Sequence, residues 1–108
     1  MAVVDGAKLT GYLLDPTHKV GWHKGRFLAA NGFDTADIDG VRAALLAHCQ
    51  KNDVAESETT PYGTKYRIDG PLEGGLGLNP LVRTVWQIDA GQAAPRFVTM
   101  RPLRTKTP

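Results

Sequence analysis

Alternating polar and apolar positions run through the second half of the chain and predict β-strands. The alternation is clearest in three runs bounded by turn residues: Tyr62–Ile68, Leu81–Ile88 and Arg96–Met100. Each run is rich in aromatic and β-branched residues, which favour a pleated sheet. A period of two places Thr84 on the apolar face of the second run and puts Phe97 and Thr99 on one face of the third. A weaker run, Val54–Thr60, predicts a first or edge strand.

Apolar residues in the first half follow a helical period instead. This period covers three segments: Lys8–Leu14, a stretch beginning near Lys19–Gly21, and a stretch from Ile38 to about Gln50–Asn52. Asp5 is placed to cap the first segment, and Asp37 or Thr35 to cap the third. Asn31-Gly32 ends the second, with Phe33 packing back on it. Gly25, inside the second helix, costs stability unless a neighbour packs closely there.

Helices followed by strands predict an α+β fold. We expect two to three N-terminal helices packed on one face of a three- to four-stranded antiparallel sheet. The 108 residues suit one domain, with 1–53 helical, 54–102 forming the sheet and 103–108 a tail. The first residues do not show the pattern of a secretory signal and no apolar run approaches the ~20 residues that span a bilayer, so we expect neither a signal nor a membrane partner. A single cysteine fits a cytoplasmic location.

Charge is distributed unevenly although the net charge is only +2. Residues 34–58 are rich in Asp and Glu, whereas residues 81–108 are rich in Arg. A basic surface suits phosphate-bearing partners such as RNA. The acidic middle would instead suit docking on a basic protein, and ordinary charge scatter over a solvated surface is the third interpretation. The oligomeric state is open, and a dimer through a sheet edge is compatible with the pattern.

Most candidate chemistry can be set aside from spacing alone. His18, His23 and His48 do not have a recognised metal-ligand spacing, so we expect no metal and no cofactor. The glycine-rich loop Pro71–Pro80 lacks the lysine and hydroxyl residue of a phosphate-binding loop. The sequence shows no recognisable serine–histidine–aspartate arrangement.

The segment Gly21–Phe27 is the remaining candidate, because it places His23 and Lys24 beside a tryptophan. If its helix crosses the sheet, these side chains would face hydroxyls and cations of the strands. Metal-independent RNA cleavage needs this combination: a base for the ribose 2′-OH, cations for the phosphorane and an acid for the leaving oxygen. The structural alternative is that His23 bonds a backbone carbonyl and Lys24 is solvated.

Four blocks in order carry a family resemblance: KLTGYLLDPTHKVGWHKGRFLAANGF, PYGTKYRIDGPLEG, VRTVWQID and PRFVTMRP. They resemble a small bacterial domain family of uncharacterised function that is met in toxin-type gene neighbourhoods. The order of helices and sheet is also similar to the barnase–EndoU–colicin–RelE group of toxin ribonucleases, as is the terminal strand. This resemblance implies a small toxin-like, metal-independent ribonuclease. The alternative is a non-catalytic protein- or RNA-binding module, such as an immunity or antitoxin partner of a neighbour-encoded protein.

The resemblance also implies roles for particular residues. His23 would be the general base or acid, and the other catalytic residues would bind the phosphate or donate hydrogen bonds. The expected catalytic residues are His23, Lys24, Arg83 and Thr84. The expected substrate-binding residues are Tyr62, Lys65, Trp86, Thr99 and Arg101. Tyr62 and Trp86 would offer faces for base stacking, although the period of two also suits Trp86 as a core residue.

Overall fold

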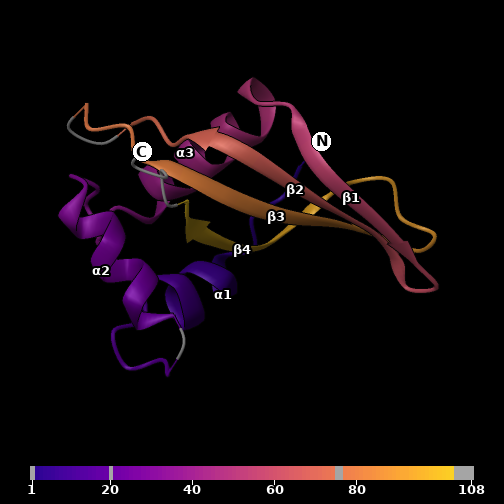
Figure 1. Ribbon diagram of the computed structural model, residues 1–108. Coiled ribbons are helices and arrows are strands. Elements are labelled where there is room, and N and C mark those ends of the chain that lie inside the picture. The colour runs from indigo at the N-terminus through magenta and orange to yellow at the C-terminus, as the bar shows by residue number, and fades with distance from the viewer. Residues whose placement is uncertain (1, 20, 75–76, 104–108) are drawn as a thin grey trace.

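An antiparallel meander of four strands, in the order β1-β2-β3-β4, forms the frame of the computed structural model (Figure 1). The structure describes residues 2–19, 21–74 and 77–103, so the predicted tail beyond 103 and part of the glycine-rich loop lie outside the described residues. The helical elements are α1 (Gly6–Lys8), the π-helical turn η1 (Leu9–Leu13), α2 (Trp22–Ala30) and α3 (Ile38–Lys51). The strands are β1 (Val54–Thr60), β2 (Gly63–Pro71), β3 (Leu81–Asp89) and β4 (Arg96–Pro102). The helices precede the sheet, which confirms the predicted α+β class.

Capping chemistry fixes the ends of α2 and α3 where the sequence predicted them. The Asp37 carboxylate accepts a hydrogen bond from the Gly40 amide at 3.0 Å and so begins α3. Gly32 has a φ of 87°, the left-handed conformation that favours glycine after a helix. The Phe33 amide then donates to the Leu28 carbonyl at 3.0 Å, and Phe33 is buried. These contacts confirm the predicted C-terminal cap of the second helix.

The first helical segment contains a wider helical turn than the α-helix that its apolar period predicts. Asp5 caps it as expected, but its second half is a π-helical turn in which the Leu14 amide donates to the Leu9 carbonyl at 2.7 Å. Leu9 and Leu13 remain on one side and are fully buried. Apolar periodicity does not distinguish one wide turn from an α-helical turn. Such π-helical turns occur often at functional sites.

A β-bulge in β4 corrects the predicted alternation of that strand. Trp86 pairs with Phe97, but the next pair along β3 is Val85 with Thr99, so β4 contains one extra residue. Phe97 and Met100 are therefore both buried on the side that the helices cover. The prediction that Phe97 and Thr99 share a face is wrong.

The two sides of the sheet differ in composition. The inner face packs against the helices and supplies the core residues Ile68, Val82, Trp86, Phe97 and Met100. The register places the opposite set of side chains together on what we call the outer face: Glu56, Glu58, Lys65, Arg67, Asp69, Arg83, Val85, Gln87, Asp89, Arg96, Thr99 and Arg101. Within the described residues, no helix is long and apolar enough to cross a membrane.

Candidate functional site

Three polar side chains meet where η1 and α2 reach β4. Lys24 Nζ donates to Thr99 Oγ1 at 2.7 Å, and Tyr12 Oη lies 2.8 Å from the same hydroxyl oxygen. The ammonium group also lies 5.7 Å from the centre of the Tyr12 ring. We call Tyr12, Lys24 and Thr99 the Thr99 cluster. It joins three elements that are far apart in the sequence, at the edge of the outer face.

Two glycines allow α2 to approach η1 closely enough to form this cluster. A Cβ at Gly25 would lie 3.0 Å from the Leu13 carbonyl oxygen, and a Cβ at Gly21 would collide with the Tyr12 carbonyl. A glycine inside a helix costs stability unless a neighbour packs closely against it, and the contact at Gly25 is the close packing expected there. Because both glycines flank Lys24, the same close packing directs the Lys24 side chain toward β4.

The environment of Tyr12 changes its acidity. Burial on its own raises the pKa of a phenol, but hydrogen bonds with Thr99 and Lys24 and the nearby ammonium charge lower it, and the net effect is a lowered pKa. His18 lies edge-on to the Tyr12 ring with their centres 4.9 Å apart. The Gly21 amide donates to His18 Nδ1 at 3.0 Å, so the neutral imidazole carries its proton on Nε2. A tyrosine of enhanced acidity thus sits beside a lysine.

A stack of side chains extends along α2 next to this cluster. The ring of His23 lies 3.7 Å from that of Trp22, with an angle of 32° between their planes. The Arg26 guanidinium lies 5.6 Å from the Trp22 ring centre. His23 and Arg26 are exposed and Trp22 is half-buried. Planar and cationic groups are therefore presented to solvent on the same helix as Lys24.

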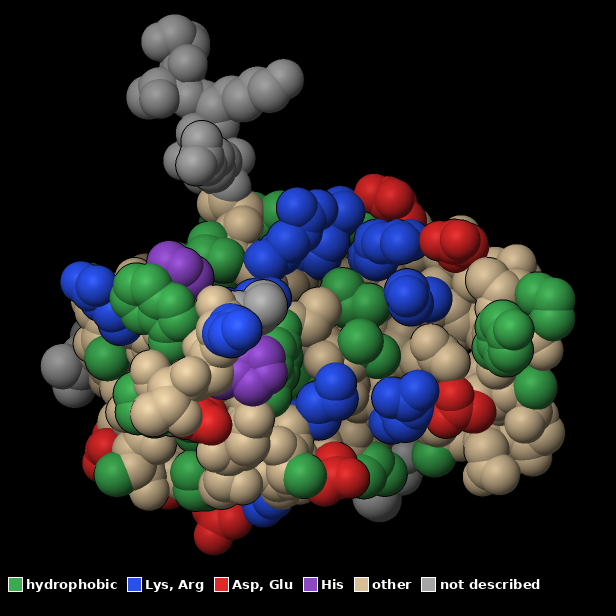
Figure 2. Space-filling view, turned by 90° about the horizontal axis from the view of Figure 1, so that it is seen from below, with side chains coloured by type: hydrophobic (Ala, Val, Ile, Leu, Met, Phe, Trp, Pro, Cys, Tyr) green, Lys and Arg blue, Asp and Glu red, His purple; other side chains and the backbone are tan. Residues whose placement is uncertain are grey.

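The outer face carries cations of two kinds. Arg83 forms a bidentate pair with Asp69, at 2.6 and 2.8 Å, and reaches Glu56 at 3.1 Å, which raises the pKa of Arg83. Arg67 is likewise paired with an acidic residue of β1. By contrast, Lys65 and Arg101 form no ion pair within the described part of the chain. Figure 2 shows basic side chains gathered across this side, with acidic ones mostly at its margins.

A second polar network lies on the inner face. His48 Nε2 donates to the Gly70 carbonyl at 3.0 Å, because a carbonyl can only accept. Nδ1 therefore accepts from the Thr84 hydroxyl at 2.9 Å, and Trp86 Nε1 donates to the same hydroxyl oxygen at 2.8 Å. Burial lowers the pKa of His48. Every polar atom of this buried network has a partner, which is typical of a structural element.

The structure brings some of the expected site residues together and separates others. Lys24 and Thr99 are in contact, His23 lies on the same turn of α2 as Lys24, and three further cations share the outer face: Lys65, Arg83 and Arg101. Thr84 and Trp86 are 0% and 1% exposed on the inner face, so a substrate on the outer face cannot reach them. We therefore omit both from the site. Tyr62 is 80% exposed in the turn between β1 and β2.

Sequence reasoning missed Tyr12 and His18 as site residues. Tyr12 fitted the apolar period of its helix, and that period gives no sign of where its hydroxyl group points. Contact with Thr99 depends on a pairing 87 positions apart in the chain. Among the described residues, no three His, Cys, Asp or Glu side chains are grouped so that they could hold a metal ion.

The fold and this surface define a small α+β domain whose four-stranded meander exposes a basic face beside a helix. The chain belongs to the family DUF6883, a domain of unknown function, whose model matches residues 1–104. This match confirms the resemblance to an uncharacterised small domain family. Comparison with curated proteins and with solved structures gives no significant match. The association with toxin genes and the similarity to toxin ribonucleases stay predictions.

Proposed function

We propose that this domain is a metal-independent endoribonuclease that acts on RNA in the cytoplasm. The observation that carries the proposal is the Thr99 cluster, in which Lys24 Nζ and Tyr12 Oη both contact Thr99 Oγ1. A phosphodiester needs a cation and hydrogen-bond donors around its non-bridging oxygens, together with a group that can remove a proton. The cluster supplies these functions at the edge of a basic surface.

Each proton and bond can be assigned to a group in this region. Tyr12, as the phenolate, takes the proton of the ribose 2′-OH, and the 2′ oxygen forms a bond to phosphorus. Lys24 stabilises the charge on the phosphorane. The Thr99 hydroxyl accepts from Lys24 and donates to the Tyr12 phenolate, which it holds in position. The bond from phosphorus to the 5′ oxygen breaks, and His23 as imidazolium gives that oxygen its proton. The products are a 2′,3′-cyclic phosphate and a free 5′-hydroxyl.

The outer face would hold the rest of the RNA strand. Lys65 and Arg101 form no ion pair within the described residues, so their charges can contact phosphates directly. Arg83 is held by Asp69 and Glu56 and contributes mainly to the shape and stability of the face. Tyr62 lies in the turn at one end of the sheet, where it is exposed enough to stack on a base.

The acidic residues support RNA over a basic protein as the partner. Asp37 caps α3, and Asp39 pairs with Arg42 on the same helix. Glu56 and Glu58 pair with arginines of the outer face. Since these four carboxylates have partners inside the domain, they are less available for docking on a basic protein.

Incubation of the purified protein with total bacterial RNA in EDTA tests the proposal. We expect discrete cleavage by the wild type, with 2′,3′-cyclic phosphate ends. Lys24→Met should lower the rate by about 10²–10³-fold, the usual cost of removing one transition-state donor. Lys51→Met is the matched control, because Lys51 is an exposed lysine paired with Glu73 on another part of the surface. Tyr12→Phe and Tyr62→Phe form a second matched pair, in which only the first should reduce cleavage.

The outcomes separate catalysis from binding. Equal rates for Lys24→Met and Lys51→Met, with both proteins folded, would contradict the proposed centre. If the folded wild type binds RNA but does not cleave it at high excess, the domain is a binding module and the catalytic proposal is wrong. If it neither binds nor cleaves RNA, the proposal fails as a whole.

A further inference from the structure

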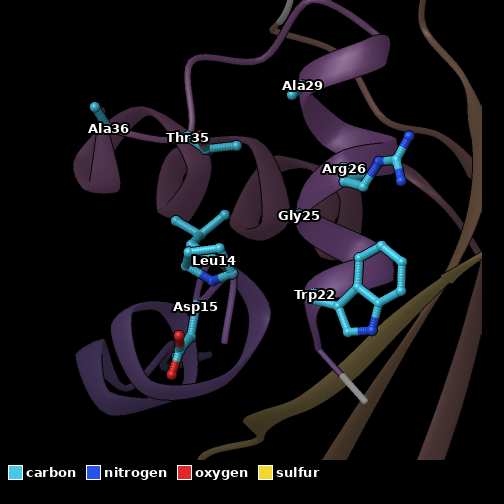
Figure 3. A pocket seen from close by; sticks show the side chains of 9 residues that line it. Leu14, Asp15, Trp22, Gly25, Arg26, Ala29, Thr35 and Ala36 are labelled. Atoms are coloured by element: carbon cyan, nitrogen blue, oxygen red, sulfur yellow. The ribbon is translucent and has the colours of Figure 1, made fainter. Parts of the chain in front are cut away.

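A groove lies along α2, lined by residues outside the Thr99 cluster, and has no assigned role. Its volume is about 530 Å³, within the 300–1,000 Å³ usual for small-molecule sites. The residues that line it come from the end of the first helical segment, from α2 and from the turn before α3: Leu14, Asp15, Pro16, Trp22, Gly25, Arg26, Ala29, Thr35 and Ala36. Figure 3 shows Trp22 and Arg26 along α2, Leu14 and Asp15 across from them, and Thr35 and Ala36 on the third side.

The lining of the groove is apolar with opposite charges on facing walls. Trp22 and Arg26 are one turn apart on α2, and their side chains are in cation–π contact at 5.6 Å. Across the groove, the Asp15 carboxylate is fixed by Thr17, whose amide and hydroxyl both donate to Oδ1 at 2.8 and 2.6 Å. Its Oδ2 is thereby left able to accept a hydrogen bond from a ligand. An aromatic ring would contact the apolar walls, and an anionic group would lie at Arg26.

We propose that this groove binds a nucleotide, with the base between the walls and its phosphate on Arg26. A nucleobase is planar and carries N–H donors, which suit Trp22 and the Asp15 carboxylate. Its phosphate suits the guanidinium of Arg26. This inference rests on the proposed function, because a nucleotide is the repeating unit of the RNA strand that the domain would cleave. The groove would then hold one nucleotide of the RNA strand.

Intrinsic fluorescence provides a direct binding assay, because the chain has two tryptophans and Trp86 is buried in the core. The protein is titrated in EDTA with AMP, GMP, CMP and UMP, and separately with adenosine and inorganic phosphate. We expect saturable quenching by at least one mononucleotide, weaker quenching by the nucleoside and none by phosphate. Trp22→Phe should remove the signal change. Arg26→Met should reduce the nucleotide affinity to that of the nucleoside.

A matched pair of alanines tests the location. Ala29 lines the groove, whereas Ala30 is the next residue of α2, also exposed and outside the lining. Ala29→Phe should weaken nucleotide binding at least tenfold, and Ala30→Phe should leave it unchanged. No saturation with any mononucleotide, quenching by phosphate alone, or equal affinities for the two phenylalanine variants would overturn the inference.

The assay distinguishes failure of the groove from failure of the proposed ribonuclease. Lys24→Met should still bind mononucleotides, because Lys24 is not part of the groove. A wild type that binds nucleotides but cleaves no RNA would support the groove and overturn the ribonuclease. A wild type that cleaves RNA, with an Ala29→Phe variant that cleaves equally well and no nucleotide binding by either, would overturn the groove alone.

Discussion

Two groups of side chains in this domain both contain a histidine and a threonine, but one group is buried and the other is partly exposed to solvent. On the inner face His48, Thr84 and Trp86 form a closed chain of hydrogen bonds that ends on a backbone carbonyl. On the other side, Lys24 bonds Thr99, and His23 lies exposed on the same turn of α2. A histidine near a threonine is therefore not informative alone. What separates a structural group from a candidate functional one is whether its donors and acceptors are already used and whether water reaches it.

The largest effect on stability should come from breaking the closed network. His48→Ala removes a buried ring and leaves the Thr84 hydroxyl and the Gly70 carbonyl without their partner. We expect the free energy of unfolding to fall by about 2–4 kcal/mol. His23→Ala, on the exposed side, should change it by less than about 0.5 kcal/mol. Urea denaturation measures both, and equal midpoints for the two variants would contradict the assignment of His48 as structural.

A smaller effect should separate two arginines that each hold an aspartate with two hydrogen bonds. The Arg83 side chain is 14% exposed and its partner Asp69 is 30% exposed, whereas Arg96 is 47% exposed. Arg83→Met should cost about 1–2 kcal/mol, because a half-buried carboxylate loses its charged donors. Arg96→Met should cost less, and its effect should shrink further in high salt. A larger loss for Arg96→Met would mean that burial is not what gives the Arg83 pair its strength.

Local chemistry explains why most elements of the fold were predictable. The cap at Asp37, the left-handed Gly32 and the apolar stripe of α3 are set by residues within a turn of one another. The strands follow from alternation alone. The bulge in β4 was not predictable in this way, because its extra residue is compensated by contacts of Phe97 and Met100 with the helices. Only the packed core decides between a bulge and a strict period of two.

The candidate site was less predictable than the fold, for the same reason. The alternation with a period of two already placed Thr84 beside apolar residues and so indicated that it is buried. Its hydrogen-bond partner, His48, comes from α3. The sequence indicated Lys24 and Thr99 separately, and their contact depends on how closely α2 approaches η1. That approach is permitted by Gly21 and Gly25 and uses a wide turn at Tyr12. Tertiary contacts of this kind have no periodic signal.

The pH dependence of stability offers the finest test of the same contrast. Burial lowers the pKa of His48 in the folded chain, whereas the unfolded chain binds a proton at the ordinary value of about 6.5. The unfolded state therefore binds more protons below that pH, so the contribution of His48 to stability should be constant above it and fall as the pH decreases through it.

Glutamine variants at both positions isolate this effect. His48→Gln removes the titrating group, so the loss of stability between neutral and mildly acidic pH should become shallower. His23→Gln should keep the wild-type slope, and urea midpoints at several pH values across this window measure both. If the slope persists in His48→Gln and disappears in His23→Gln, the titrating histidine lies on the exposed side. The closed network would then not be what holds His48 neutral.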